Sequence, residues 1–237
     1  MKNSAVILAG GNSTRMRGTV KDKCLELLLG TPIIMHSVKA FVESGSIKEI
    51  VFVCKDDEQK ENIKSLSAKY LEENGISFIF ADGGKERYNS VYNGLLCTSE
   101  DIDIVFIHDS ARPLVKKESI VELCEACKIS KASVLANKVV DSIKQNMDYP
   151  SNVSCELKDL KREVLWAMQT PQVFDKELII NAYTHIIENN ISITDDVSAA
   201  SEIGAKITIV ENLNMNTKIT LPQDIALVEY IMKQNNE

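Results

Sequence analysis

AVILAGGNSTRMRGTVKDK, residues 5–23, joins an apolar run to a strongly basic loop. A short apolar run bounded by glycines, here Ala5 to Leu8, is typical of a parallel strand that is covered on both faces. After Gly11 come small hydroxyl residues and then four cations, Arg15, Arg17, Lys21 and Lys23. Backbone N–H groups and long cationic side chains are the donors that bind phosphate. The stretch therefore predicts a buried strand that ends in an anion-binding turn.

The loop differs from two familiar phosphate-binding motifs. It has neither the G-x-x-x-x-G-K-[ST] spacing of a P-loop nor the G-x-G-x-x-G fingerprint of dinucleotide sites. An ordinary strand-to-helix loop with solvated charges is the alternative interpretation. Four cations within nine residues, in a chain whose formal net charge is −7, favour anion binding.

Length and composition predict one α/β domain over residues 1–237. With 44% hydrophobic and 26% charged residues the chain can bury a full core. No apolar run approaches 18 residues and the N-terminus lacks signal-peptide character, so we expect a cytoplasmic protein with no membrane partner. A pI near 5.2 disfavours nucleic acid as a partner, because such binders need a broad positive field.

The six cysteines predict reduced, buried thiols rather than a metal or redox site. They are spread through apolar segments, and Cys124 and Cys127 fall within one helical pattern that has no second Cys/His pair to complete four ligands. Core packing is the favoured interpretation. The positions are Cys24, Cys54, Cys97, Cys124, Cys127 and Cys155.

Strands alternate with helices over the first half of the chain. Expected strands cover 50–54, 76–80, 104–107 and 132–136, and expected helices cover 31–42, 56–73, 86–97 and 117–129. The first of these helices is expected to be capped by Thr31-Pro32 and to bury Ile34, Val38 and Phe41. Alternation of this kind implies right-handed crossovers and a mostly parallel sheet, with ligands at the carboxyl ends of its strands.

Three turns should therefore converge at one edge of the sheet. They are residues 10–23, 82–87 and 108–113. Gly83-Gly84 permits close backbone approach, and Arg87 and Ser90 begin the next helix. Asp109 and Arg112 supply a carboxylate and a cation, with a local ion pair as the alternative. A lone His at a strand end, His108, is more often scaffold than base.

Residues 137–165 are expected to leave the body as an extended arm. The segment is polar and lacks helical period, so it is expected to pack on another subunit. Beyond it we expect a helix over 175–189, a helix to Ile203 capped by residues 194–196, and a strand over 206–210. Pro222 opens a last helix in which Ile225, Leu227, Val228 and Ile231 should pack inward.

Seven motifs together resemble the 2-C-methyl-D-erythritol 4-phosphate cytidylyltransferases of the non-mevalonate isoprenoid pathway, over nearly the whole chain. They are Ala9-Gly10-Gly11 through Arg15-Met16, Lys23, Asp82-Gly83-Gly84 with Arg87 and Ser90, His108-Asp109 with Ala111-Arg112-Pro113, Trp166 with Gln169-Thr170-Pro171-Gln172, Thr194-Asp195-Asp196, and Lys218-Ile219-Thr220.

The resemblance implies a Rossmann-like nucleotidyltransferase fold, a homodimer with interdigitating arms, and CMP transfer from CTP to a polyol phosphate with release of pyrophosphate. The implied catalytic residues are Arg15, Lys23 and Lys218, and Mg²⁺ would bridge the CTP phosphates with Asp109 as a candidate ligand. Nucleotide-binding residues would be Ala9, Gly10, Gly11, Gly83, Gly84, Arg87, Ser90 and Ser110. Substrate-binding residues would be Asp109, Arg112, Thr170 and Thr194, with Ser142 and Arg162 reaching the partner's site, unless the two arm residues are merely solvated.

The chain departs from the family pattern at three places: Gly10 where Ala is common, Asp22 where Pro is usual, and Ser142 where Thr is typical. The first departure, and the seven-residue step from Met16 to Lys23, resemble the related ribitol-5-phosphate cytidylyltransferases. Leu165-Trp166-Ala167 resembles the isoprenoid branch. CMP transfer to methylerythritol phosphate is thus the leading prediction, and ribitol 5-phosphate is the alternative acceptor. Alternatives of other kinds are a non-catalytic nucleotide-binding module and a nucleotidyltransferase for another base.

Overall fold

The apolar run of the opening stretch forms the middle of a seven-stranded sheet in the computed structural model, which describes residues 1–11, 22–149 and 154–234. Strand β1 (Asn3–Leu8) lies between β4 (Glu49–Cys54) and β6 (Ile104–Asp109) and is parallel to both. The order is β11-β7-β10-β6-β1-β4-β5, with β5 at Ser77–Asp82, β7 at Ala132–Lys138, β10 at Trp166–Asp175 and β11 at Thr208–Glu211.

Only β10 runs antiparallel to its neighbours among the described strands of this sheet. The predicted mostly parallel α/β sheet is thus confirmed. β10 corresponds to residues for which the sequence analysis assigned no element, and its pairing with β7 shifts register between Met168 and Gln172.

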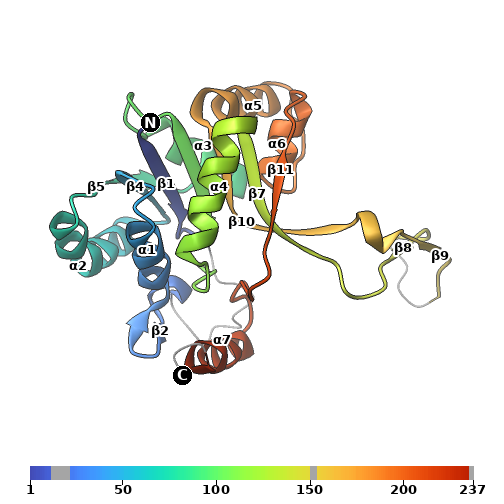
Figure 1. Ribbon diagram of the computed structural model, residues 1–237, viewed down its shortest axis with the longest axis horizontal. Helices are drawn as coiled ribbons and strands as arrows, with labels where there is room; N and C mark the ends of the chain where they lie inside the picture. The colour runs from blue at the N-terminus through green and yellow to red at the C-terminus, as the bar shows by residue number, and fades with distance from the viewer. Residues whose placement is uncertain (12–21, 150–153, 235–237) are drawn as a thin grey trace.

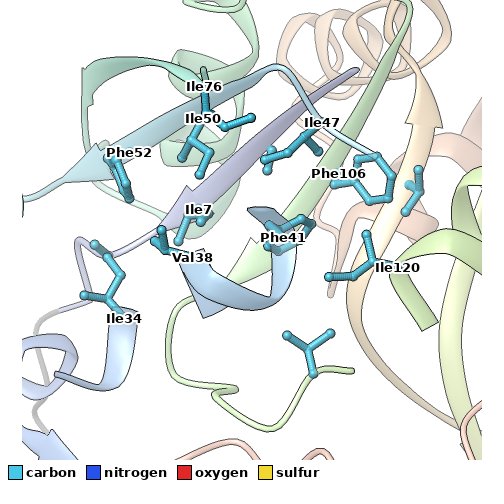
Figure 2. Packing of buried hydrophobic residues seen from close by; sticks show 14 of the residues in the cluster. Ile7, Ile34, Val38, Phe41, Ile47, Ile50, Phe52, Ile76, Phe106 and Ile120 are labelled. Atoms are coloured by element: carbon cyan, nitrogen blue, oxygen red, sulfur yellow. The ribbon is translucent and has the colours of Figure 1, made fainter. Parts of the chain in front are cut away.

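Successive side chains of the central strands point to opposite faces of the sheet, and both faces are buried under helices. Ile7, Phe52 and Phe106 face the layer formed by α1 (Ile33–Glu43), α2 (Asp57–Glu73) and α4 (Lys117–Ser130), as Figure 2 shows. Val6, Val51 and Val105 face α3 (Arg87–Leu96), α5 (Lys176–Glu188) and α6 (Asp196–Glu202). Coverage on both faces explains why these strands are continuously apolar.

The last helix, α7 (Pro222–Gln234), packs away from the sheet against a smaller cluster formed by Leu28, Ile33, Leu114 and Ile219. Near it lie the short helix η2 (Lys23–Leu25) and the two-stranded β2 (Leu27–Leu28) and β3 (Thr31–Pro32). Val228 is fully buried there, but Leu227 is 45% exposed, so the prediction that Leu227 packs inward was wrong. Ile225 and Ile231 pack against the cluster as predicted, and Met232 joins them.

The predicted arm leaves the body of the molecule as a long extension (Figure 1). It carries the antiparallel pair β8 (Lys144–Asn146) and β9 (Leu157–Asp159) and the short helix η3 (Arg162–Val164). Several of its apolar side chains are exposed in the single chain, among them Val140, Tyr149 and Val164. The arm therefore has no hydrophobic core of its own among its described residues, and dimerisation through it stays a prediction.

Two further expectations need correction. Thr31 and Pro32 do not form a cap and first turn: they pair with β2, and α1 begins at Ile33 with no side-chain cap hydrogen bond. Cys97 and Cys155 are only partly buried, whereas the other four thiols are buried in the core as predicted. Among the described residues no helix is long and apolar enough to cross a membrane, and the cytoplasmic location stays a prediction.

Gly94 provides a test of the packing between α3 and the sheet. A Cβ at this position would lie 2.6 Å from Val6 Cγ1 and 2.7 Å from Val53 Cγ2, both on buried strands. Overpacking of this kind costs about 1–3 kcal/mol, so we expect Gly94→Ala to lower the free energy of unfolding in spite of alanine's higher helix propensity. Chemical denaturation measures the loss. Glu61→Ala on the exposed side of α2 is the control, with a change within about 0.5 kcal/mol, and equal stabilities of the two variants would contradict the packing described here.

Candidate active site

A cavity of about 310 Å³ opens where β1, β4 and β6 end at the same edge of the sheet. Its lining comes from all three predicted turns and from the segment before α7. The prediction that these turns converge is confirmed. The lining residues are Leu8, Ala9, Gly10, Gly11, Lys23, Cys24, Val53, Gly84, Lys85, Glu86, Arg87, Ser90, Asp109, Ser110, Ala111 and Lys218.

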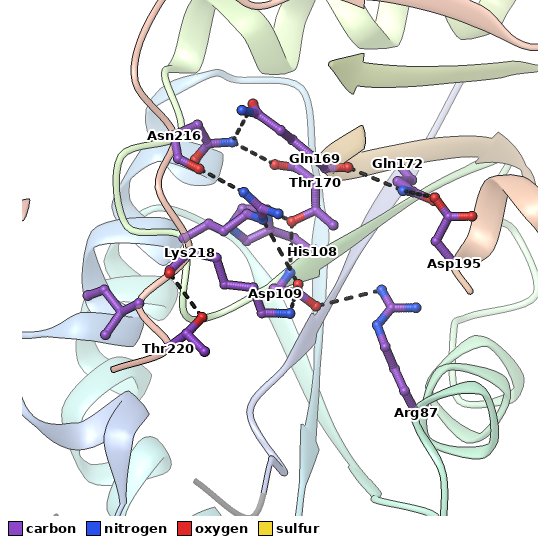
Figure 3. Close-up of polar contacts among 12 residues, drawn as sticks. Arg87, His108, Asp109, Gln169, Thr170, Gln172, Asp195, Asn216, Lys218 and Thr220 are labelled. Carbon is purple, nitrogen blue, oxygen red and sulfur yellow. Dashed lines mark hydrogen bonds and ion pairs between the residues drawn. The ribbon is translucent and has the colours of Figure 1, made fainter. Parts of the chain in front are cut away.

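Asp109, the last residue of β6, brings three cations together (Figure 3). Lys218 Nζ donates a 2.6 Å hydrogen bond to Oδ2, Arg87 Nη2 lies 3.6 Å from Oδ1, and Arg112 Nε lies 4.0 Å from Oδ2. Burial alone would raise the pKa of this carboxyl, but the cations outweigh burial and hold the pKa well below its usual range. Asp109 is therefore an anion that fixes cations at the cavity wall. The local ion pair with Arg112, which was the alternative interpretation, is one part of this larger cluster.

Arg87 is held from its other side by a fully buried carboxylate. Its Nη1 and Nη2 donate to the two oxygens of Asp196 at 2.8 and 2.9 Å, and the hydroxyl of Tyr183 donates to Oδ1 at 2.5 Å. A two-pronged contact of this kind fixes the plane of the guanidinium. Arg87 thereby links the start of α3 to the start of α6 while one edge still lines the cavity.

His108 is scaffold, in agreement with the sequence-based interpretation. Its ring is fully buried, with Nε2 3.2 Å from Ser37 Oγ and Nδ1 3.1 Å from Thr170 Oγ1. Burial lowers its pKa to about 3, so the ring is neutral at physiological pH. Thr170 Oγ1 also accepts from the Asp109 backbone N–H at 3.1 Å, which ties β10 to the end of β6 directly behind the carboxylate.

The segment that carries Lys218 is anchored by amide and guanidinium contacts. Arg112 Nη1 donates to the Asn216 carbonyl at 2.7 Å, and Asn216 Nδ2 donates to the Thr170 carbonyl at 3.0 Å. Lys23 Nζ donates to the Ile219 carbonyl at 2.7 Å, so the two lysines approach the cavity from the same side.

Glycines allow the backbone to pack closely around the cavity. A Cβ on Gly84 would lie 2.2 Å from Asn89 Cβ, and one on Gly83 would lie 3.1 Å from the Cys54 carbonyl. The N–H of Gly84 donates to Ser90 Oγ at 2.8 Å. The N–H groups of Ala9 and Gly10 both donate to the Val53 carbonyl, so these two residues line the cavity without a free backbone donor.

With this geometry in place, comparisons with known proteins identify the family. A family model described as 2-C-methyl-D-erythritol 4-phosphate cytidylyltransferase matches residues 4–234. The chain belongs to this family. A cytidylyltransferase of that name from Caldanaerobacter subterraneus is 38% identical over 234 residues, covering 99% of this chain and 100% of the relative. The chloroplastic one from Oryza sativa is 36% identical over 231 residues, covering 98% of this chain and 74% of the relative.

Solved structures agree on the fold. A 2-C-methyl-D-erythritol 4-phosphate cytidylyltransferase from Francisella tularensis has a TM-score of 0.78 at 27% identity and covers 98% of this chain and 100% of its own. A 4-diphosphocytidyl-2C-methyl-D-erythritol synthase from Anaerococcus prevotii, at 24% identity, has a TM-score of 0.83 and covers 98% of each chain. The predictions of a nucleotidyltransferase enzyme and of an isoprenoid-pathway cytidylyltransferase are confirmed, and the ribitol phosphate branch is not favoured.

Several residues implied by the cytidylyltransferase resemblance lie away from this cavity. Arg112 and Thr170 lie behind Asp109, and Thr194 lines a separate cavity of about 100 Å³ beside Glu86 and Arg87. Ser142 and Arg162 are in the arm, where Arg162 Nη1 donates to the Val140 carbonyl at 2.7 Å. Arg15 lies outside the described residues.

The cavity contains carboxylates of the kind that bind Mg²⁺ together with substrate phosphates. The described residues include no group of three or more His, Cys, Asp or Glu side chains that could hold a metal. Mg²⁺ commonly takes one or two carboxylates together with substrate phosphates and water. Asp109 offers such a carboxylate in the cavity.

Two polar residues of the site escaped the sequence analysis as functional candidates. Gln59 and Asp22 form a buried contact behind Lys23, yet Gln59 stands in a highly charged helix and Asp22 attracted notice only as a departure from the family pattern. No motif or periodicity marks Gln59. Only the departure at Asp22 could have drawn attention to this pair.

Because His108 is buried and neutral, the free energy of unfolding is expected to depend on pH. In the unfolded chain a His takes up a proton near pH 6.5, whereas the folded ring does so only near pH 3. Between these values the unfolded state binds more protons, so the free energy of unfolding falls as the pH falls, by at most about 1.4 kcal/mol per pH unit. The Asp109 carboxyl adds to this loss only below about pH 4.

Ring NMR signals provide the measurement. Burial also lowers the pKa of His36, so bulk denaturation alone does not isolate His108. We expect the His108 ring resonances to stay constant from pH 8 to pH 4.5. A midpoint near pH 6.5 would show that the ring is not buried and neutral as described.

Proposed function

We propose that this chain transfers CMP from CTP to 2-C-methyl-D-erythritol 4-phosphate and releases pyrophosphate. The observation that carries the proposal is the cavity at the sheet edge, whose lining brings together Lys23, Lys218 and Asp109. A cavity with this charge suits a nucleoside triphosphate, and the chain belongs to the family named for that acceptor.

In the proposed reaction a phosphate oxygen of the acceptor attacks the α-phosphorus of CTP. One P–O bond forms, the bond to the β-phosphate oxygen breaks, and pyrophosphate leaves with that electron pair. No covalent enzyme intermediate is needed, so the protein acts by positioning the reactants and stabilising charge. Lys23 and Lys218 neutralise charge that develops on the phosphates, and Arg15, which lies outside the described residues, is proposed to assist them.

The cytidine end of CTP is proposed to bind at the glycine-rich wall. Gly83, Gly84 and Ser90 are proposed to let a base or ribose approach the backbone, and Ala9, Gly10, Gly11 and Ser110 line the same cavity. Arg87 contributes mainly through its fixed guanidinium, because Asp196 already takes two of its N–H groups. In this proposal Arg87 orients Asp109 and closes one side of the site.

Mg²⁺ is the proposed cofactor. Asp109 would help to hold the ion, which would offset charge on the phosphates of CTP. The carboxylate stays ionised for this role because the surrounding cations keep its pKa low.

The acceptor is proposed to lie beside Asp109 and Thr194, with Arg112 and Thr170 holding Asp109 from behind. Its phosphate is proposed to be bound by Ser142 and Arg162 from the arm of a second copy, which makes the enzyme a homodimer with composite sites. The exposed apolar side chains of the arm support this proposal, because a partner would bury them.

A side-by-side assay tests the acceptor. With CTP and Mg²⁺ present, we expect a higher kcat/KM for 2-C-methyl-D-erythritol 4-phosphate than for ribitol 5-phosphate, measured as pyrophosphate release. UTP, GTP and ATP in place of CTP are the controls for the base. If ribitol 5-phosphate were preferred tenfold, about 1.4 kcal/mol in transition-state binding, the acceptor assignment would be wrong.

Subunit mixing tests the composite site. Arg162→Ala and Lys23→Ala should each lower the activity of their own homodimer by about a hundredfold or more. A mixed dimer has one site with both residues intact, so random exchange at equal amounts should restore up to about a quarter of wild-type activity. Native mass spectrometry verifies exchange, and each variant alone is the control. A mixture that exchanges and yet remains inactive would place each site within one chain.

A further inference from the structure

One side-chain amide binds the chain on both sides of the basic loop. Gln59 of α2 is 1% exposed, and its Nε2 donates to the Ala9 carbonyl at 3.2 Å and to Asp22 Oδ2 at 2.7 Å. Its Oε1 accepts from the Lys55 backbone N–H at 2.9 Å, so every polar atom of the amide is used. Ala9 follows β1 and Asp22 precedes Lys23, so Gln59 links the ends of two separate cavity-lining segments.

Asp22 is a buried carboxylate whose two oxygens are both occupied. Oδ2 also lies 3.0 Å from Lys55 Nζ, whose charge compensates for burial of the anion. Oδ1 accepts from the backbone N–H of Cys24 at 3.2 Å, which caps the short helix η2 that begins at Lys23. The carboxylate therefore fixes the backbone on which Lys23 stands.

The backbone at position 22 is extended, with φ −147° at Asp22. The side chain of this extended residue holds it in place through its contacts with Gln59, Lys55 and Cys24.

From these contacts we propose that Asp22 and Gln59 are positioning residues for Lys23 in CMP transfer. The inference rests on the proposed function, in which Lys23 stabilises charge in the reaction. Neither Asp22 nor Gln59 lines the cavity, so both act through the lysine. The competing explanation is that this buried network only stabilises the fold.

A double-mutant cycle separates these explanations. Asp22→Ala, Lys23→Ala and the double variant are compared by kcat and by KM for CTP. If Asp22 acts through Lys23, Asp22→Ala should lower kcat about ten- to a hundredfold in the wild-type background, with a smaller change in KM. In the Lys23→Ala background the same change should lower kcat less than about twofold, because no ammonium remains to be positioned. Gln59→Leu should follow the same pattern.

An equal fold-change in both backgrounds would overturn the inference, since it would show an effect independent of the lysine. If Asp22→Ala does not fold, Asp22→Asn replaces it in the cycle: it preserves volume and the Oδ1 acceptor but puts an amide nitrogen against Gln59 Nε2 and Lys55. The proposed function fails separately, through absence of CMP transfer by the wild-type protein. If Lys23→Ala keeps full turnover, the inference also fails, because the lysine has no part in the reaction.

Asp56→Ala is the matched control. Asp56 caps α2 by accepting from the Gln59 backbone N–H at 2.8 Å, but in the described part of the chain it neither hydrogen-bonds to Asp22 nor lines the cavity. We expect a lower melting temperature and the same small change in kcat in both backgrounds. If Asp56→Ala reproduced the dependence on Lys23, the effect would come from α2 as a whole and the specific role of Asp22 and Gln59 would be excluded.

Discussion

The buried charge of Asp109 is the constraint on which the site depends. A carboxylate at this depth requires cations, and they come from α3, from the turn after β6 and from the segment before α7. Arg87 in turn requires Asp196 at the start of α6. Segments far apart in sequence are thus brought to one point by electrostatics. In the lining of the cavity Lys23, Lys85, Arg87 and Lys218 outnumber the carboxylates of Glu86 and Asp109, and this excess of positive charge suits a triphosphate.

The sheet supplies the rigid frame for this cluster. The parallel strands β1, β4 and β6 end at the same edge, so the turns that follow them must meet there. Helices on both faces of the sheet bury these strands away from solvent. The antiparallel β10 contributes a side chain, Thr170, that holds the end of β6. Its irregular register with β7 coincides with Thr170, whose hydroxyl holds both His108 and the Asp109 backbone.

Apolar patterning predicted the body of the fold, and polar tertiary contacts set the limits of that prediction. The burial of Ile7, Phe41 and Phe106 is predicted by their positions in the apolar pattern of a strand or helix. Thr31-Pro32 looked like a helix start because its local chemistry suits one, but pairing with β2 prevailed. The position of the cavity was predicted from the turns that contain glycines and charged residues. Gln59 could not be found in this way, since nothing in a charged helix marks the one amide that turns inward.

Cys24 lies in the cavity wall, a place where a thiolate would be exposed to oxidants and electrophiles. Burial first, and then the neighbouring Asp22 carboxylate, raise the pKa of this thiol well above its ordinary value. Burial likewise raises the pKa of Cys54 to about 12. Only the thiolate is a strong nucleophile, so both sulfurs are chemically quiet at neutral pH. A site of this construction can keep a thiol beside its substrates without a thiolate that would compete as a nucleophile at neutral pH.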